Sequence, residues 1–146
     1  MSELPKLEDL GNISGKRVLV RTDFNVPLDN GIIRDDLRIR EAIPTLKYLV
    51  DNGAEVTACT HLGRPKGKFE EKYSLEPIRV RLNEILPGIK LLDNLRFNSG
   101  EEANDPQFIE RLVAGQDIYV NDAFGASHRS HASITGPPQL LPSAAG

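Results

Sequence analysis

The 146-residue sequence lacks the features of secreted, membrane-spanning and nucleic-acid-binding proteins. Its single cysteine, Cys59, cannot form an internal disulfide, which suits a reducing cytosol. No apolar run reaches the roughly 18 residues of a membrane span, and the start MSELPK does not resemble a signal peptide. Acidic residues outnumber basic ones by 21 to 18, so binding to nucleic acid by neutralising many phosphates is not expected. We expect a cytoplasmic protein with neither a membrane nor a nucleic-acid partner.

Apolar strands and helical patterns alternate along the chain. The length fits one domain, and 39% apolar residues with 12 glycines are typical of a globular one. Strands are predicted over 17–22, 54–60, 89–92 and 117–120. Apolar residues at helical spacing predict three helices, which lie between Asp35 and Asn52, between Ser74 and Pro87, and between Asp105 and Gly115.

This alternation predicts an α/β fold, a Rossmann-like three-layer sandwich with helices on both faces of a parallel sheet. Pro44 is expected to kink or restart the first helix, because proline removes a helical hydrogen bond. The residues from 132 onward have no charge and three prolines, and we predict a loop there. Cys59 lies within an apolar strand, which indicates a buried, inert thiol.

Polar side chains follow every predicted strand, at the sheet edge where open α/β proteins bind ligands. Three of the four loops contain an arginine, and Arg38 enters from the first helix; the loop arginines are Arg64, Arg96 and Arg129. Guanidinium groups match phosphate oxygens in pairs. Asp23 and Asn25 follow the first strand and could bind hydroxyl or carboxyl groups. The placement predicts a small phosphorylated acid as ligand. The alternative is that each arginine pairs separately with a carboxylate on a solvated surface.

Two weaker patterns do not support a site. Gly15-Lys16 lacks both the glycine spacing and the following Ser or Thr of a phosphate-binding loop. His128 and His131, taken with Asp122, lack a strong third metal ligand. No metal site is therefore predicted in this chain.

Four segments follow one another in a fixed order along the chain, RTDFNVP at 21–27, HLGRPKG at 61–67, NLRF at 94–97 and YVNDAFGASHRSH at 119–131. In this order they resemble the corresponding segments of phosphoglycerate kinases. The stretch DDLRIREAIPTLKYLVDNGA is similar to the first helix of the same family, so the resemblance covers essentially the whole chain. It implies a glycolytic kinase that exchanges a phosphoryl group between ATP and 3-phosphoglycerate, giving ADP and 1,3-bisphosphoglycerate.

The resemblance also implies roles for individual residues. Asp23 and Asn25 would bind the hydroxyl and carboxyl end of the glycerate. Arg38 would be catalytic, neutralising the transferring phosphoryl group. The basic cradle for the 3-phosphate would consist of His61, Arg64, Arg96 and Arg129. Mg-ATP or Mg-ADP would bind another domain of a monomeric enzyme, leaving no cofactor site in this chain.

The sequence departs from the family's pattern in two places, and both affect how much of the family's N-terminal domain we expect in this chain. Only 31 residues separate Arg64 from Arg96, where the family usually has a further strand and helix, so the sheet could lack a strand there or have a rebuilt edge. The chain also ends at Gly146, before the family's N-terminal domain is finished. We expect residues 1–146 to be an incomplete N-terminal substrate-binding domain, without the nucleotide-binding domain and inactive alone. The alternatives are a stand-alone phosphoglycerate-binding module without catalysis and a non-functional, poorly folded fragment.

Overall fold

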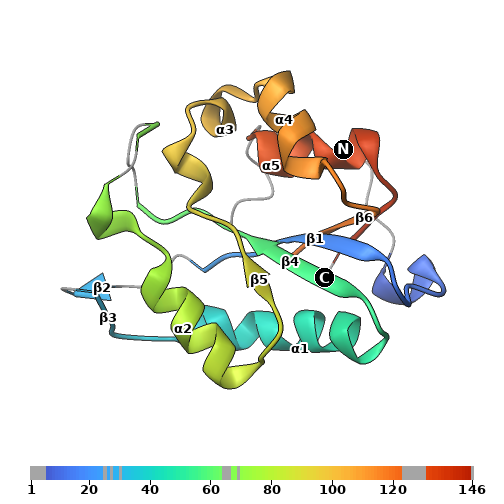
Figure 1. The fold of residues 1–146 in the computed structure, drawn as a ribbon, viewed down its shortest axis with the longest axis horizontal. Helices are drawn as coiled ribbons and strands as arrows, with labels where there is room; N and C mark the ends of the chain where they lie inside the picture. The colour runs from blue at the N-terminus through green and yellow to red at the C-terminus, as the bar shows by residue number, and fades with distance from the viewer. Residues whose placement is uncertain are drawn as a thin grey trace.

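A parallel five-stranded sheet forms the centre of the molecule (Figure 1). The computed structural model describes residues 6–24, 26, 28–29, 31–63, 67–68, 70–122 and 131–145. The order across the sheet is β5-β4-β1-β6-β7. The strands are β1 (Arg17–Arg21), β4 (Glu55–Cys59), β5 (Lys90–Leu91), β6 (Ile118–Asn121) and β7 (Ser143–Ala145). The four predicted strands are all present and parallel.

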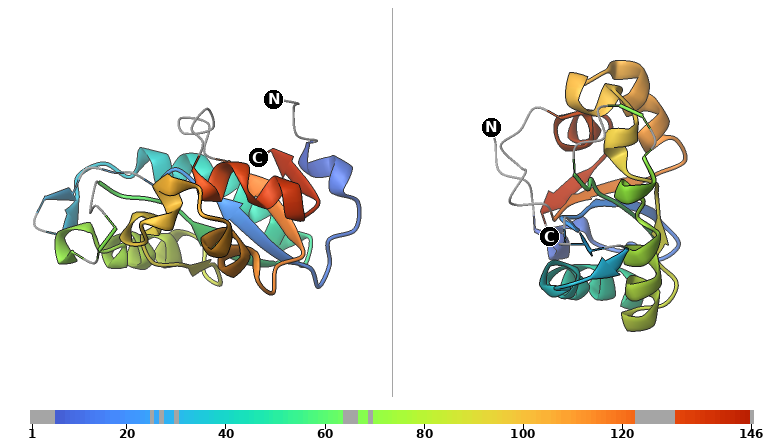
Figure 2. Two further views of the ribbon diagram at one scale, coloured as in Figure 1. Left: turned by 90° about the horizontal axis from the view of Figure 1, so that it is seen from above. Right: turned by 90° about the vertical axis from the view of Figure 1, so that its left-hand side faces the viewer.

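Helices cover both faces of this sheet (Figures 1 and 2). One face carries α1 (Leu37–Asp51) and α2 (Glu76–Ile85). The other carries four shorter helices, α3 (Gly100–Ala103), α4 (Pro106–Val113), α5 (Ala132–Thr135) and α6 (Pro137–Leu140). The predicted α/β class and its three layers are thereby confirmed.

The burial of both faces of the central strand β1 explains why its sequence is continuously apolar and does not alternate with polar residues. Val18, Leu19 and Val20 are all fully buried, because β1 is paired with β4 on one side and β6 on the other, and helices cover both of its faces. Val18 and Val20 belong to the core under α1 and α2, whereas Leu19 belongs to the core under α4. By the same alternation Arg21 points to the side of α3 and α5.

The long helices begin and end close to the predicted positions. Asp105 accepts a hydrogen bond from the backbone N–H of Gln107 at 3.1 Å, as expected of the residue before an N-terminal proline. The Ser74 hydroxyl accepts one from Glu76 N–H at 3.2 Å at the start of α2. Pro44 lies inside α1, which continues from Leu37 to Asp51 without restarting.

The prediction of a loop from residue 132 onward is wrong. This stretch forms α5, α6 and the strand β7, which pairs with β6 and buries Ala144 completely. Each element is only three or four residues long, too short for apolar periodicity to reveal it. Its stability comes from tertiary burial, since Ala132, Ile134 and Pro137 are enclosed as well.

Several other short elements were not predicted. The strands β2 (Leu28–Asp29) and β3 (Ile32–Ile33) form a separate antiparallel pair. Three 3-10 turns complete the described elements, η1 (Leu7–Leu10), η2 (Glu71–Tyr73) and η3 (Leu95–Phe97). Lys6, just before η1, bridges to Ala145, so the two ends of the described chain lie side by side. Across the described residues, no helix is long and apolar enough to cross a membrane.

Candidate functional site

The strand order reverses at β1, and this places the candidate site. The chain builds outward from β1 through β4 to β5, and then returns to the opposite side of β1 with β6 and β7. Open α/β sheets bind ligands outside the carboxyl ends of their strands at such a reversal. Of the predicted site residues, Asp23, Arg38, His61 and Arg96 are described at this edge, whereas Asn25, Arg64 and Arg129 lie outside the described residues.

Asp23 and Arg38 form an ion pair at this edge. Asp23 follows β1, and Arg38 is the second residue of α1; its guanidinium Nη1 donates to Asp23 Oδ2. The Arg38 side chain is 52% exposed and that of Asp23 only 21%. The carboxylate therefore anchors the arginine, while about half of its side-chain surface remains accessible to solvent.

The loops after β1 and β4 are tied to each other beneath this pair. The Thr22 hydroxyl donates to the carbonyl of Cys59 at 3.1 Å, and Phe24 N–H donates to the Thr60 hydroxyl at 3.0 Å. Both threonines and Phe24 are fully buried. These bonds hold the backbone that carries Asp23 against the backbone that carries His61.

Asn94 attaches the next loop to the same edge. Its side-chain oxygen accepts from Leu62 N–H at 3.2 Å and from Arg96 N–H at 3.0 Å, while its amide donates to the Leu62 carbonyl at 2.7 Å. Arg96, on η3, is 6% exposed and donates through Nη1 to the Gly63 carbonyl at 3.0 Å. Its Nε lies 3.7 Å from a Glu102 carboxylate oxygen.

A buried polar cluster lies beside His61 and was not predicted from the sequence. We call it the Arg21 network; its members are Arg21, His61, Glu101, Tyr119 and Ser133, of which His61 is 7% exposed and the other four are fully buried. Arg21 Nη2 lies 2.6 Å from His61 Nδ1, and Arg21 Nε donates to the Ser133 hydroxyl at 2.8 Å. The one feature of the sequence that could have pointed to this cluster was Arg21 itself, a charged residue at the end of the apolar run of β1.

Glu101 provides the negative charge of the Arg21 network. It accepts from the Ser133 backbone N–H at 2.7 Å and from the Ser133 hydroxyl, and it lies 3.9 Å from Arg21 Nη2. The Tyr119 hydroxyl donates to the Ser133 carbonyl at 2.5 Å. Burial raises the pKa of Tyr119 well above its usual value, so this phenol stays a donor at neutral pH.

Two further ionisable groups lie at or near the carboxyl ends of the strands. Burial raises the pKa of the Cys59 thiol to about 12, and the prediction of a buried cysteine is confirmed. Burial also raises the pKa of Asp122, after β6, to about 6, although a hydrogen bond from the Thr45 hydroxyl at 3.2 Å lowers it in part. No group of three or more His, Cys, Asp or Glu side chains able to hold a metal occurs in the part of the chain that the structure describes.

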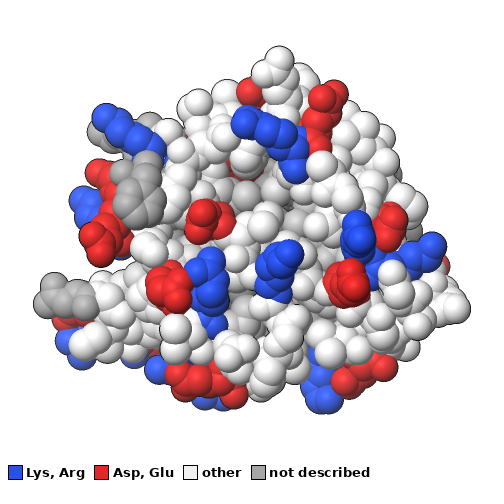
Figure 3. Space-filling model, viewed as in Figure 1, with Lys and Arg blue, Asp and Glu red and all other residues white. Residues whose placement is uncertain are grey.

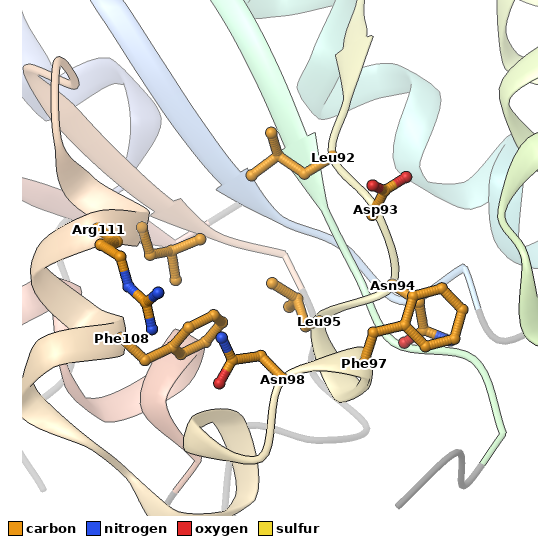
Figure 4. A pocket seen from close by; sticks show the side chains of 9 residues that line it. Leu92, Asp93, Asn94, Leu95, Phe97, Asn98, Phe108 and Arg111 are labelled. Atoms are coloured by element: carbon orange, nitrogen blue, oxygen red, sulfur yellow. The ribbon is translucent and has the colours of Figure 1, made fainter. Parts of the chain in front are cut away.

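Most other described arginines follow the surface alternative. Arg34, Arg40 and Arg79 each pair with a nearby carboxylate, and Figure 3 shows charges of both signs interspersed over one face of the molecule. A cavity of about 430 Å³ lies away from Asp23 and Arg38, between α4 and the segment after β5 (Figure 4). Its walls include Leu92, Leu95, Phe108 and Leu112, so it is mainly apolar and unlike the anion site expected at the edge.

Comparison with known proteins identifies the family. The model of the phosphoglycerate kinase family matches residues 7–90 and 87–146. The phosphoglycerate kinase of Dictyoglomus turgidum is 48% identical over 92% of this chain and 40% of its own length. A chloroplastic phosphoglycerate kinase of Volvox carteri is 48% identical over 94% of this chain and 36% of its own. The structure of phosphoglycerate kinase from Coxiella burnetii superposes with a TM-score of 0.91 at 35% identity, over 97% of this chain and 41% of that one.

The same comparisons bear on the short stretch between Arg64 and Arg96. The alignment with the Dictyoglomus protein runs over 159 positions, more than the 146 residues present here, so that relative has residues that this chain lacks. The two family matches overlap at residues 87–90, which include Lys90, the first residue of the two-residue strand β5. The chain spans about 40% of the length of that relative. The family model, in turn, matches nearly all of this chain, from residue 7 to residue 146. The chain belongs to the phosphoglycerate kinase family.

Proposed function

We propose that this chain is the N-terminal, 3-phosphoglycerate-binding part of a cytoplasmic phosphoglycerate kinase. The observation that supports the proposal is the position of the Asp23–Arg38 pair, His61 and Arg96 after strands or at a helix start, at the edge where the strand order reverses in a chain of this family. The enzyme would exchange a phosphoryl group between 1,3-bisphosphoglycerate and ADP, or between ATP and 3-phosphoglycerate.

Each residue of the proposed site has chemistry suited to this ligand. For the 3-phosphate, Arg96 would supply a nearly buried guanidinium and His61 would supply an imidazole. Hydrogen bonds to a charged group are stronger where little water screens them, so both side chains are suited to a phosphate. Arg64 and Arg129 would extend this cradle. Asp23, with Asn25, would bind the hydroxyl and carboxyl end of the glycerate.

Arg38 is proposed to act on the reacting phosphoryl group. Phosphoryl transfer depends on positioning and on neutralising charge spread over the phosphoryl oxygens. Arg38 combines a fixed anchor on Asp23 with an accessible guanidinium, so it can turn toward an acyl phosphate bound in front of the α1 N-terminus.

Transfer also requires Mg-nucleotide in line with the acceptor. No group of three or more His, Cys, Asp or Glu side chains able to hold a metal occurs among the described residues, and no step in this chain is assigned to the nucleotide. The nucleotide would bind a domain in the remaining length of the enzyme. We expect no ATP-dependent turnover from the purified 146-residue chain; measurable turnover would refute this assignment.

Calorimetry with 3-phosphoglycerate tests the binding site. Arg96→Ala should weaken binding by about 1.5–3 kcal/mol, roughly 10- to 150-fold, because it removes a charged hydrogen-bond donor. Arg40→Ala is the matched control, since Arg40 is exposed on α1 and pairs with Asp36. It should leave the affinity unchanged. No binding heat from the parent chain at millimolar ligand, or equal affinity of Arg96→Ala and the parent, would contradict the proposal.

A further inference from the structure

The side-chain hydrogen bonds of Arg21 determine what His61 can offer a ligand. Arg21 is fully buried at the end of β1, and its Nη2 lies 2.6 Å from His61 Nδ1. A guanidinium has five N–H donors and no acceptor, so His61 Nδ1 must be the acceptor. A neutral imidazole whose Nδ1 accepts carries its proton on Nε2.

An imidazolium at His61 would conflict with this arrangement. It would place an Nδ1–H donor against an Arg21 N–H donor, and a second positive charge beside a fully buried one. Both effects disfavour the charged form of histidine. The Arg21 guanidinium stays charged at any physiological pH, so it is His61 that remains neutral.

Arg21 cannot turn away from His61 because its other donors are engaged. Nε donates to the Ser133 hydroxyl at 2.8 Å, Nη1 donates to the Thr22 carbonyl, and Glu101 lies 3.9 Å from Nη2. Glu101 is itself held by the backbone N–H and the hydroxyl of Ser133. The guanidinium is thereby fixed from β1, α3 and α5 together.

We propose that Arg21 is a positioning residue that keeps His61 neutral with its proton on Nε2, so that His61 meets the phosphate as an uncharged hydrogen-bond donor. The inference rests on the proposed function for the identity of the ligand. The arginines of the site would then supply all of its positive charge, and the contribution of His61 to binding would not change with pH in the range where histidines ordinarily titrate.

The titratable groups around Arg21 and His61 include a carboxylate, Glu101 of α3, which lies 3.9 Å from Arg21 Nη2. Its charge would favour an imidazolium, but it does not relieve the conflict of two N–H donors between Arg21 Nη2 and His61 Nδ1, which lie 2.6 Å apart. Cys59 of β4 and Tyr119 of β6 interact electrostatically with both Arg21 and Glu101, and burial keeps the thiol and the phenol neutral at physiological pH. Arg96 of η3 donates to the carbonyl of Gly63, two residues after His61, and its positive charge also disfavours an imidazolium at His61.

Nitrogen-15 NMR of the ligand-free chain tests the inference directly. His61→Gln identifies the His61 signals among the three histidines. We expect a neutral Nε2–H imidazole at His61 from pH 8 to pH 6. A parent spectrum in which His61 carries its proton on Nδ1, or becomes protonated around pH 6.5 as ordinary histidines do, overturns the proposal without any variant.

The double variant Arg21→Met with Glu101→Gln removes both buried charges together, so neither is left unpaired. His61 should then become protonated at a higher pH than in the parent. The control is Arg17→Met at the exposed start of β1, where Arg17 pairs with Glu55 at 3.5 Å; it should leave the His61 signals unchanged. A double variant that folds and protonates His61 at no higher pH than the parent would overturn the role of Arg21.

Calorimetry with 3-phosphoglycerate gives the functional readout. From pH 7.5 to pH 6, the ratio of the dissociation constants of the double variant and the parent should fall about threefold or more, because only the variant gains an imidazolium. A constant ratio would contradict the proposal. Absence of binding by the parent would instead refute the proposed function, while the NMR result on His61 would still decide this inference.

Discussion

Replacing Glu101 by alanine should destabilise the chain strongly, although Glu101 lies on the four-residue helix α3. The carboxylate is fully buried, accepts two hydrogen bonds from Ser133 and lies 3.9 Å from Arg21. Its removal leaves the buried Arg21 guanidinium without a counter-charge and leaves the Ser133 N–H without its acceptor.

The magnitude follows from the cost of an unpaired buried charge. Breaking a buried pair by removing one partner costs about 3–5 kcal/mol. Unfolding entropy is about 2.1 cal/mol/K per residue, so 1 kcal/mol shifts the melting temperature of a chain this long by roughly 3 °C. Glu101→Ala should therefore lower the melting temperature by about 10–15 °C. Glu101→Gln keeps an acceptor for Ser133 N–H and should have a smaller effect.

Thermal unfolding followed by circular dichroism measures this shift. Glu55→Ala is the control, because the Glu55 side chain is 73% exposed and lies 3.5 Å from Arg17, whose side chain is 62% exposed. An exposed pair of this kind is worth about 1 kcal/mol or less, so the control should melt within roughly 3 °C of the parent. Equal shifts for the two alanine variants would refute the assignment of Glu101 as the buried counter-charge of Arg21.

Three further predictions concern the edge of the sheet. Burial raises the pKa of Asp122 from 3.8 to about 6 in the folded chain. Its contribution to stability is therefore lost as the pH rises from about 4 through 6. The stability gained by Asp122→Asn over the parent in urea unfolding should therefore increase from pH 4 to pH 7, and a constant difference would contradict it. Burial raises the pKa of Cys59 to about 12, so alkylation at pH 8 should be at least about a hundredfold slower in the folded chain than in urea; comparable rates would show an accessible thiol. Gly63 has a φ of +64°, and a Cβ there would overlap the Tyr73 ring, so Gly63→Ala should cost about 1–3 kcal/mol of unfolding free energy and weaken 3-phosphoglycerate binding. Gly88→Ala, where a Cβ meets nothing within 4 Å, is its control, and equal losses in both variants would argue against the overlap.

The elements predicted from the sequence are those whose patterns are long enough to read. Val18, Leu19 and Val20 form a continuous apolar run because β1 is buried on both faces. In α1, apolar side chains recur at helical spacing because one face packs on the sheet. By contrast, β7 depends on pairing with β6, and nothing in the local sequence SAA distinguishes a strand from a loop.

In the candidate site, too, the position of residues along the chain was predictable and the contacts between distant segments were not. The positions of four residues after strands or at a helix start predicted that they would lie at one edge of the sheet, because parallel strands all end there; the four are Asp23, Arg38, His61 and Arg96. Their roles were assigned by resemblance to the family and remain proposals. The sequence offered no reason to join Glu101 to Arg21, since the two are separated by 80 positions along the chain and meet only when α3 packs beside β1.

Three conclusions follow from the amino-acid sequence alone: the α/β class, the family and the edge at which a phosphorylated ligand is expected. Those conclusions depend on local apolar patterns and on ordered motifs, which are properties of neighbouring residues. Two features emerge only in the folded chain: the last described residues complete the sheet, and Arg21 is held against His61. Both depend on contacts between segments distant in the chain, where burial makes each polar group find a partner that the local sequence does not specify.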